Sequence, residues 1–196
     1  MKYRTILLFG APGAGKGTQG KILATVPQFY HCACGDVFRN LRTDDELGRT
    51  FVEYSSRGEL VPDEATVQLW RHHIDGCTRA GQFHPIRDTL ILDGIPRNVH
   101  QAQMLQEAID VRAVLNLTCP DQAKLIERLQ RRALHENRLD DANLDVIRSR
   151  LMTYEKQTRP VLDFYGPGLV HTIDGTQTPV QVLRDVLNVV AKFVSA

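Results

Sequence analysis

Five short apolar runs recur along the chain, and between them apolar residues repeat at the spacing of a helix face. Short, near-continuous apolar runs are typical of strands covered on both faces, as in a parallel sheet. Their alternation with helices predicts a doubly wound α/β layer architecture. The five predicted strands are Tyr3–Phe9, Tyr30–Cys34, Thr89–Leu92, Ala113–Leu117 and Leu169–Ile173.

Proline and glycine mark the helix boundaries that we expect. Pro120 and Pro179 suit first helical positions, where the missing N–H of proline leaves no hydrogen bond unmade. Gly58 is expected to end a helix, since glycine readily adopts the conformation that follows a last turn. Pro160 is expected to kink or end another helix, because it removes an interior hydrogen bond.

Two regions contain more helix than one crossover between strands requires. Residues 36–80 hold several helical patterns between the second and third predicted strands. Residues 128–158 contain an arginine-rich helix end, a short polar loop and a further helix. At 196 residues, the chain is expected to form one domain from which these two regions project.

Composition and charge argue against several classes of function. The formal net charge is +1, which disfavours a general nucleic-acid-binding surface. No apolar run approaches the roughly 18 residues that a membrane span needs. The N-terminus reads as a strand leading into a site rather than a secretion signal. We expect a cytoplasmic protein, a monomer, with no nucleic-acid or membrane partner.

The cysteine and histidine spacings argue against a structural metal site. The cysteines contain no C-x-x-C pair, so we expect neither structural zinc nor a disulfide framework. The seven histidines show no metal-like spacing, and we expect them to have packing or surface roles. The four cysteines are Cys32, Cys34, Cys77 and Cys119.

The strongest motif follows the first predicted strand, where residues 10–18 read G-A-P-G-A-G-K-G-T and lead into a helix. Such a loop forms a cradle of backbone N–H groups for phosphates. Lys16 would add positive charge beside the transferring phosphates. The general motif places a hydroxyl directly after the lysine, but here Gly17 stands there and the hydroxyl follows on Thr18.

A second group of polar residues suits another anion near this loop. Asp93 ends the third predicted strand, and ligands gather at the carboxyl ends of strands in α/β sheets. It would orient magnesium or its waters, with capping of the next segment as the alternative. Arg97 and Gln101 follow at intervals of four, and with Asp36 and Arg39 they suggest a second anionic group across from the loop.

Arginines concentrate in the second helix-rich region. Arg128 and Arg132 share a helix face, where like charges destabilise an isolated helix. A bound polyphosphate accounts for the cluster better than a solvated surface, because guanidinium groups match phosphate geometry. A solvated role suits Arg131 and Arg148. The full set is Arg128, Arg131, Arg132, Arg138, Arg148 and Arg150.

These motifs together resemble the adenylate kinase family of nucleoside monophosphate kinases, in family order and over almost the whole chain. The family patterns G-x-P-G-x-G-K-G-T, G-D-x-x-R, L-V-x-D-E and D-G-[FY]-P-R match residues 10–18, 35–39, 60–64 and, with Ile95 replacing the aromatic residue, 93–97. The patterns R-x-x-x-R, R-x-D-D, R-x-R-L and D-G-T match residues 128–132, 138–141, 148–151 and 174–176.

The resemblance implies an α/β fold of the P-loop nucleoside triphosphate hydrolase type, with a five-stranded parallel sheet. Only five residues separate Arg132 from Arg138, so the chain is similar to short-lid forms that lack the zinc-bearing insert. The implied parts are a core of residues 1–35, 81–127 and 142–196, a helical acceptor-binding insert at 36–80 and a lid at 128–141.

The resemblance also implies Mg²⁺-dependent, reversible phosphoryl transfer from ATP to AMP, giving two ADP. Magnesium would be held by phosphates and waters, with Asp93 as an outer partner and no direct protein ligand. The implied catalytic residues are Lys16, Arg128, Arg132, Arg138 and Arg150. The implied ATP site is Gly13, Ala14, Gly15, Lys16, Gly17, Thr18, Arg128, Gly175 and Thr176. The implied AMP site is Cys34, Gly35, Arg39, Gly58, Leu60, Val61, Gly94, Arg97, Gln101, Arg138 and Arg150.

Departures from the family pattern leave an alternative open. Ala33 and Cys34 replace the usual Ser-Thr pair, and a thiol is a weaker hydrogen-bonding group toward the acceptor base. A UMP/CMP kinase on the same scaffold would typically carry alanine at position 34 and asparagine at position 101, so Gln101 favours AMP. A GTPase-like switch would need an N-K-x-D motif, which is absent. A non-catalytic nucleotide-binding module is disfavoured because no expected charged residue is missing.

Overall fold

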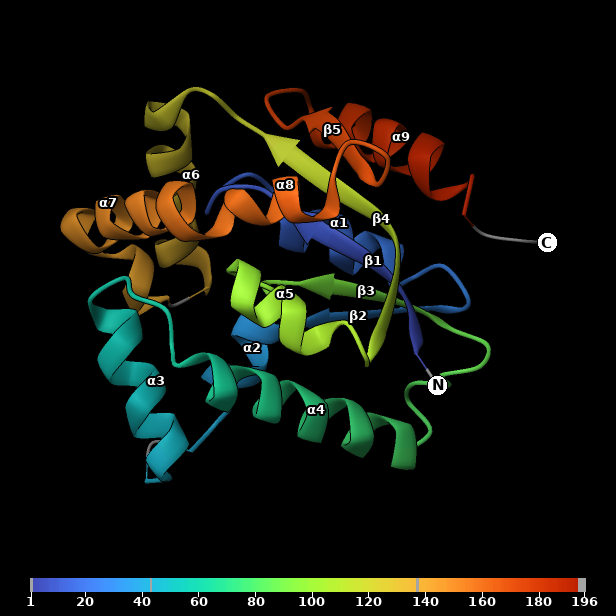
Figure 1. Ribbon diagram of the computed structural model, residues 1–196. Coiled ribbons are helices and arrows are strands. Elements are labelled where there is room, and N and C mark those ends of the chain that lie inside the picture. The colour runs from blue at the N-terminus through green and yellow to red at the C-terminus, as the bar shows by residue number, and fades with distance from the viewer. Residues whose placement is uncertain (1, 43, 137, 194–196) are drawn as a thin grey trace.

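The computed structural model describes residues 2–42, 44–136 and 138–193, which form a single parallel sheet flanked by helices (Figure 1). The strand order is β2-β3-β1-β4-β5, and every neighbouring pair is parallel. This confirms the predicted five-stranded α/β fold. The strands are β1 Tyr3–Phe9, β2 Phe29–Ala33, β3 Thr89–Asp93, β4 Ile109–Thr118 and β5 Val170–Asp174.

Helices connect the strands and cover both faces of the sheet. The helices before β4 are α1 Lys16–Leu23, α2 Cys34–Arg39, α3 Glu46–Ser56, α4 Asp63–Arg79 and α5 Val99–Leu105. The later ones are α6 Gln122–Glu136, the 3-10 helix Leu139–Asp141, α7 Leu144–Thr153, the π-helical turn Tyr154–Thr158, α8 Pro160–Tyr165 and α9 Pro179–Val190. No helix in the described part of the chain is long and apolar enough to cross a bilayer.

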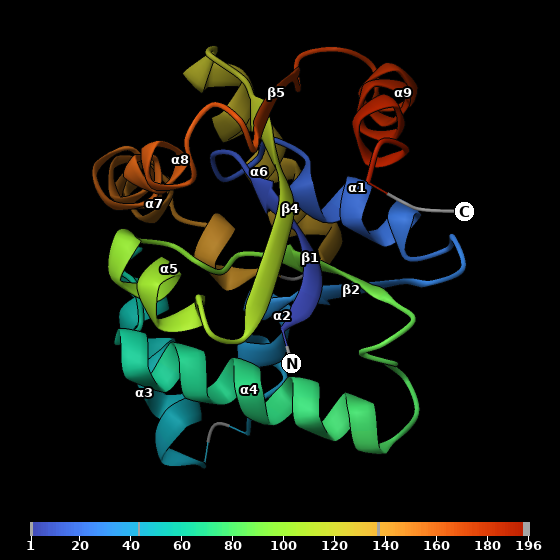
Figure 2. The same cartoon turned by 45° about the vertical axis from the view of Figure 1, so that its right-hand side comes forward.

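Two hydrophobic clusters form because alternate strand residues point to opposite faces. In β1, Leu7 and Phe9 pack into the cluster that includes Trp70 of α4 and Leu105 of α5. Residues Ile6 and Leu8 point the other way, into a cluster built with α1, α6, α7 and α9. Figure 2 shows the sheet between α5 and α8 on the left and α1 and α9 on the right. Burial on both faces explains the near-continuous apolar runs.

Several predicted boundaries are confirmed. Gly58 follows α3 with φ +72°, and Pro179 occupies the first turn of α9. Pro160 begins α8 one residue after the π-helical turn, which separates it from α7.

Other boundaries were wrong by a few residues. Pro120 lies before α6 rather than in its first position, since that helix begins at Gln122. Cys34 begins α2 instead of ending β2. The strand β4 starts at Ile109, earlier than expected, because pairing with β1 continues past a register shift between Thr5 and Ile6.

The parallel sheet determines where the functional groups meet. All strands point the same way, so the loop after β1, the start of α2 after β2 and Asp93 at the end of β3 share one edge. Residues 36–80, here called the helical insert, leave the sheet at this edge as α2, α3 and α4.

Candidate active site

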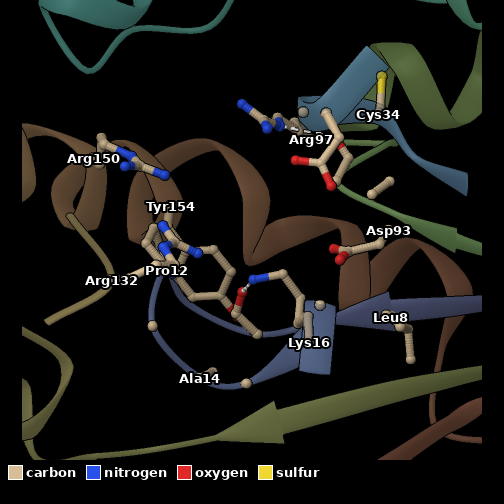
Figure 3. Close-up of a pocket in the computed structure, with 18 of the residues that line it drawn as sticks. Leu8, Pro12, Ala14, Lys16, Cys34, Asp93, Arg97, Arg132, Arg150 and Tyr154 are labelled. Atoms are coloured by element: carbon tan, nitrogen blue, oxygen red, sulfur yellow. Dashed lines mark hydrogen bonds between the residues drawn. The ribbon is translucent and has the colours of Figure 1, made fainter. Parts of the chain in front are cut away.

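A cavity of about 560 Å³ opens at the carboxyl edge of the sheet. Its walls come from the glycine-rich loop, the ends of β2 and β3, the helical insert, α6 and α7. Figure 3 shows Arg132 and Arg150 on one side, Arg97 and Asp93 on the other, and Lys16 between them. Segments far apart in the sequence therefore meet around one volume.

The glycine-rich loop joins β1 to α1 and needs glycine at specific points. Gly10 has φ +134°, and a Cβ at this position would overlap the carbonyl oxygen of Leu117 in β4. Gly13 has φ +85°, and its Cβ would lie 2.9 Å from the carbonyl oxygen of Leu125 in α6. The loop is therefore packed tightly against β4 and α6, and it leads directly into α1. The N-terminus of a helix can bind an anion through its backbone N–H groups.

Lys16 is the first residue of α1, and its side chain folds back over the loop. Its Nζ donates to the carbonyl oxygens of Gly10 at 2.6 Å and Ala11 at 3.1 Å. Burial of the ammonium group lowers the pKa of Lys16 to about 8; Asp93 opposes this shift, and the cavity arginines add to it. The ammonium group therefore lies over the phosphate-binding loop. Asp93 favours its charged form, but by less than burial disfavours it.

Asp93 faces Lys16 and Gly17 from the end of β3. It is 9% exposed, and His31 of β2 lies with Nε2 3.7 Å from Asp93 Oδ2. A Cβ on Gly17 would lie 3.8 Å from the same oxygen. This is an ordinary contact distance, and glycine at position 17 leaves the space beside the Asp93 carboxylate unfilled.

Two arginines from α6 and α7 are held by one carboxylate that is fully buried. Asp141, at the end of the 3-10 helix, is 0% exposed. Arg132 donates from Nε to Asp141 Oδ2 at 2.7 Å, and Arg150 pairs with Asp141 Oδ1 and, at 2.7 Å, with Asp140 Oδ2. Burial lowers the pKa of Arg132, and Asp141 opposes that shift. The shared carboxylate fixes the positions of both guanidinium groups.

Asp36 holds another arginine pair and links the helical insert to residues beyond α6. It pairs with Arg39 at 2.5 Å and with Arg138 at 3.3 Å. Arg138 also pairs with Glu136 at 2.7 Å. Burial raises the pKa of Asp36, but the hydrogen bond from Arg39 and the nearby charges outweigh it and hold the pKa below its usual value. The carboxylate is ionised at neutral pH and stabilises both cations.

Arg97 and Arg128 are anchored on backbone carbonyl groups instead. Arg97 donates from Nε to the oxygen of Gly94 at 2.8 Å. Arg128 donates to the oxygen of Gly175 at 3.0 Å and approaches that of Gly13 at 3.5 Å. These contacts hold both guanidinium groups at the cavity wall without neutralising their charges.

The turn after β2 meets the turn after β3 on the side of the helical insert. Gly94 has φ +82°, and its Cβ would lie 3.7 Å from the N–H nitrogen of Gly35 and 3.9 Å from Cys34 Cβ. Cys34 is 1% exposed, and burial raises the pKa of its thiol to about 11, so it stays neutral. This wall is compact and carries the positive charge of Arg97 and Arg39.

Gln101 lies in the same wall, at the start of α5, with 0% of its surface exposed. Its Oε1 accepts from the N–H of Arg97 at 2.7 Å, and its Nε2 donates to Asp63 Oδ1 at 2.7 Å. Both ends of the side-chain amide are therefore hydrogen-bonded.

Comparison with known proteins agrees with this geometry. A family model described as adenylate kinase matches residues 8–168, well over half of the chain. The chain belongs to the adenylate kinase family.

Curated relatives named adenylate kinase support this membership. The chain is 41% identical over 177 residues to the protein of Thermobifida fusca, covering 86% of this chain and 88% of the relative. It is 38% identical to the protein of Cyanothece sp. over 94% of both chains. It is 34% identical to the protein of Methanosarcina barkeri, over 96% of this chain and 99% of the relative.

The structure brings together almost every residue that the family resemblance proposed for the site. All of them line the cavity except Thr176. The hydroxyl and N–H groups of Thr176 instead contact Asp174 Oδ1, at 2.6 and 2.8 Å. The two arginines for which a solvated role was considered have exposed side chains: Arg131 is paired with Glu127 and Arg148 with Asp145. Arg131 also borders the cavity, whereas Arg148 does not line it.

Sequence reasoning missed some residues that line the cavity. Phe38 and Phe51 stack with ring centroids 5.1 Å apart and form an aromatic wall in the helical insert. Tyr154 lines the other side at the start of the π-helical turn, and burial raises its pKa to about 12. Aromatic residues on amphipathic helices usually signal packing, so the pattern alone gave no reason to assign them to an adenylate kinase site.

Proposed function

We propose that the chain catalyses reversible phosphoryl transfer from ATP to AMP, giving two ADP. The observation that carries this proposal is the convergence of one lysine and several arginines, from separate elements, around one cavity beside a phosphate-binding loop. A cavity with so much positive charge suits two nucleotides whose phosphates meet end to end.

In this proposal the ATP phosphates lie on the glycine-rich loop. Backbone N–H groups between Gly13 and Thr18 would bind the phosphate oxygens, with Lys16 beside the transferring group. Arg128, anchored between the loop and Gly175, would contact the donor from the other side. The base would lie toward Gly175 and Thr176, although Thr176 needs to leave the contact with Asp174 to take part.

The AMP phosphate would face Arg39 and Arg97, on the wall opposite the loop. The nucleoside would lie among Gly58, Leu60 and Val61, with its base toward Gln101. Cys34 and Gly35 would border the ribose and phosphate. Residues 36–80 thus act as the acceptor-binding insert.

Catalysis by this site consists of positioning and charge stabilisation. A nucleoside monophosphate is already ionised, so no side chain has to remove a proton from the acceptor. Arg132, Arg138 and Arg150 would stabilise negative charge on the transferring phosphate oxygens, which is the main requirement of phosphoryl transfer. Closure of residues 128–141 as a lid would exclude water, which would otherwise hydrolyse ATP.

The residues around Lys16 fit a magnesium ion held mainly by phosphates. Among the described residues, no group of three or more His, Cys, Asp or Glu side chains could hold a metal. One carboxylate oxygen of Asp93 borders the space beside Gly17. Mg²⁺ takes oxygen ligands and usually keeps several waters, so a carboxylate can hold it through those waters. Asp93 would orient such waters and Thr18 would contact them or the phosphates. Bound magnesium would supply neutralisation of charge on the phosphate oxygens.

The direct test is an assay of ADP formation from ATP–Mg²⁺ with AMP, UMP, CMP and GMP as separate acceptors. We expect AMP to be preferred. Phosphorylation of none of the four would refute the proposed function, and preference for UMP or CMP would refute only the acceptor. Replacing Arg97 by methionine should lower turnover greatly while the thermal midpoint stays near that of the wild type. Full turnover in that variant would rule out phosphate binding by Arg97.

A further inference from the structure

The Gln101 amide is held at both ends by groups whose hydrogen-bonding polarity cannot change. The N–H of Arg97 can only donate, and its partner at 2.7 Å is Oε1. An ionised carboxylate can only accept, and Asp63 Oδ1 lies 2.7 Å from Nε2. Reversing the amide would place its oxygen against the carboxylate and its NH₂ group against an N–H. These two contacts therefore fix which end of the amide is nitrogen.

Asp63 is itself held firmly as an anion. It is the first residue of α4, and Asn98 Nδ2 contacts both of its oxygens, at 2.8 and 3.1 Å. The ring of His100 places Nδ1 3.0 Å from Oδ2. Burial raises the pKa of Asp63, but the hydrogen bonds from His100, Asn98 and Gln101 outweigh it and hold the pKa below its usual value. The carboxylate is therefore an acceptor at neutral pH and keeps its position between α4 and α5.

Because the amide is fixed, the donor and the acceptor that it can still offer to a ligand are fixed as well. One N–H on Nε2 and one lone pair on Oε1 remain after the two contacts are made. That pair matches a base edge with a ring-nitrogen acceptor beside an amino donor, as in adenine and cytosine. Guanine and uracil present the opposite pattern, a ring N–H beside a keto oxygen. Reading them would need the reversed amide, which Asp63 and the Arg97 N–H oppose.

We propose that Asp63 is a specificity-determining positioning residue, which locks Gln101 so that the acceptor site accepts amino-edged bases over keto-edged ones. This deepens the proposed function and rests on it, because it assumes that the acceptor base faces Gln101. The fixed amide makes binding of AMP and CMP tighter than binding of GMP and UMP, because it matches the hydrogen-bonding edge of their bases. Ring size decides between purine and pyrimidine. Asp63 acts through Gln101 and need not touch the nucleotide.

The test compares Asp63→Ala with Glu64→Gln, which removes the neighbouring acidic group from the same first turn of α4 without a contact to Gln101. Dissociation constants for AMP and GMP are measured by calorimetry, and kcat and KM for both acceptors by ADP formation. In Asp63→Ala we expect the AMP-to-GMP preference to fall about tenfold, the discrimination that one bidentate contact typically provides. The change should lie in Kd and KM, with kcat at saturating AMP close to wild type. Glu64→Gln should keep the wild-type preference.

Two results would overturn the lock. One is an unchanged AMP-to-GMP preference in folded Asp63→Ala, and the other is an equal loss for both acceptors, which indicates a merely structural role. The readouts also separate this inference from the proposed function. If wild-type protein binds AMP over GMP but phosphorylates neither, the proposed function fails, and the dissociation constants of the variants still decide the lock.

Discussion

At the scale of single residues, the charge of Lys16 is expected to respond to mildly alkaline pH. Its pKa is lowered to about 8, whereas its ordinary value is 10.5. The free protein should therefore lose this positive charge as pH rises through about 8. Since kcat/KM reports groups of the free enzyme, we expect kcat/KM for ATP to fall tenfold for each pH unit above about 8. A pH profile from 6.5 to 9.5 measures this.

The Lys16→Arg variant is the control for this profile, because guanidinium does not lose its proton in this range. Its residual activity should stay flat where the wild type declines. As pH rises through this range, stability is expected to change in the opposite direction to activity. Between about pH 8 and 10.5 the unfolded chain binds more protons at this site, so the destabilisation caused by burying charged Lys16 is relieved as pH rises. Wild-type activity that is constant to pH 9.5 would contradict the assignment.

Gly10 and Gly76 provide a matched pair of glycine substitutions. Gly10 has φ +134° and no room for a Cβ, whereas Gly76 lies inside α4 with nothing within 4 Å of its Cβ position. We expect Gly10→Ala to lower the free energy of unfolding by about 1–3 kcal/mol or more. Gly76→Ala should raise it by about 0.5–1 kcal/mol through better helix propensity. Denaturant unfolding of both variants measures the difference, and equal effects would show that the loop tolerates a side chain.

The residue motifs predicted the cationic groups of the cavity but not what holds them. Lys16, Arg97 and the arginines of α6 and α7 could be placed because phosphate binding constrains their spacing. The burial of Asp141 could not, since it depends on α6 and α7 converging on one 3-10 turn. The hydrogen bond from Gln101 to Asp63 spans 38 residues, and such a contact leaves no periodic pattern in the sequence.

At the scale of elements, α7 joins the helical insert to the core. Thr153 donates from Oγ1 to the oxygen of Gly58 at 3.1 Å, and Ser149 donates to that of Arg57 at 2.8 Å. A Cβ on Gly58 would lie 2.9 Å from the oxygen of Val146. The end of α3 is therefore seated on α7 by close backbone contact and two hydroxyl groups. These contacts hold the insert over the cavity.

Removing one of these hydroxyl groups should favour an open insert. We expect Thr153→Val to raise KM for AMP by about two- to tenfold, because a net hydrogen bond contributes about 0.5–1.5 kcal/mol and a less populated closed state weakens binding in proportion. Acceptor titrations at saturating ATP measure this, and kcat should not fall.

The control for this substitution is Ser56→Ala, which removes a hydroxyl bond within α3 itself, to the oxygen of Glu53. It should leave KM for AMP unchanged. A lower thermal midpoint in Thr153→Val with an unaltered KM would indicate that the contact serves stability alone.

Element types could be predicted from the sequence, but some boundaries could not. The central strands β1, β3 and most of β4 were the clearest to identify, because burial on both faces makes them apolar, whereas the edge strands β2 and β5 are less buried and contain polar residues. The early start of β4 was missed because buried Ile109 is followed, next to the register shift, by two partly buried residues and by exposed Arg112. Pro160 indicated a break in the helix, whereas the π-helical turn before it has no sequence signature.

At the scale of the whole molecule, one side of the cavity is the carboxyl edge of the sheet, which the two hydrophobic clusters support. On the opposite side, the insert and residues 128–141 contact each other. One contact between them is the ion pair of Asp36, in the insert, with Arg138 beyond α6, at 3.3 Å. A movement of the insert therefore changes its contact with the 128–141 region, and the reverse is also true. Ligands on either side of the cavity should therefore affect one another.

We expect a non-hydrolysable ATP analogue with Mg²⁺ to tighten AMP binding about five- to tenfold, a coupling free energy within the usual range. Linkage requires AMP to tighten the analogue by the same factor. Calorimetric titrations of each ligand with and without the other measure both factors. In Asp36→Ala the insert loses its ion pair with Arg138, so both factors should fall toward one while each ligand still binds alone. If the coupling in Asp36→Ala equals that of the wild type, the two parts communicate through the rigid sheet edge rather than through Asp36.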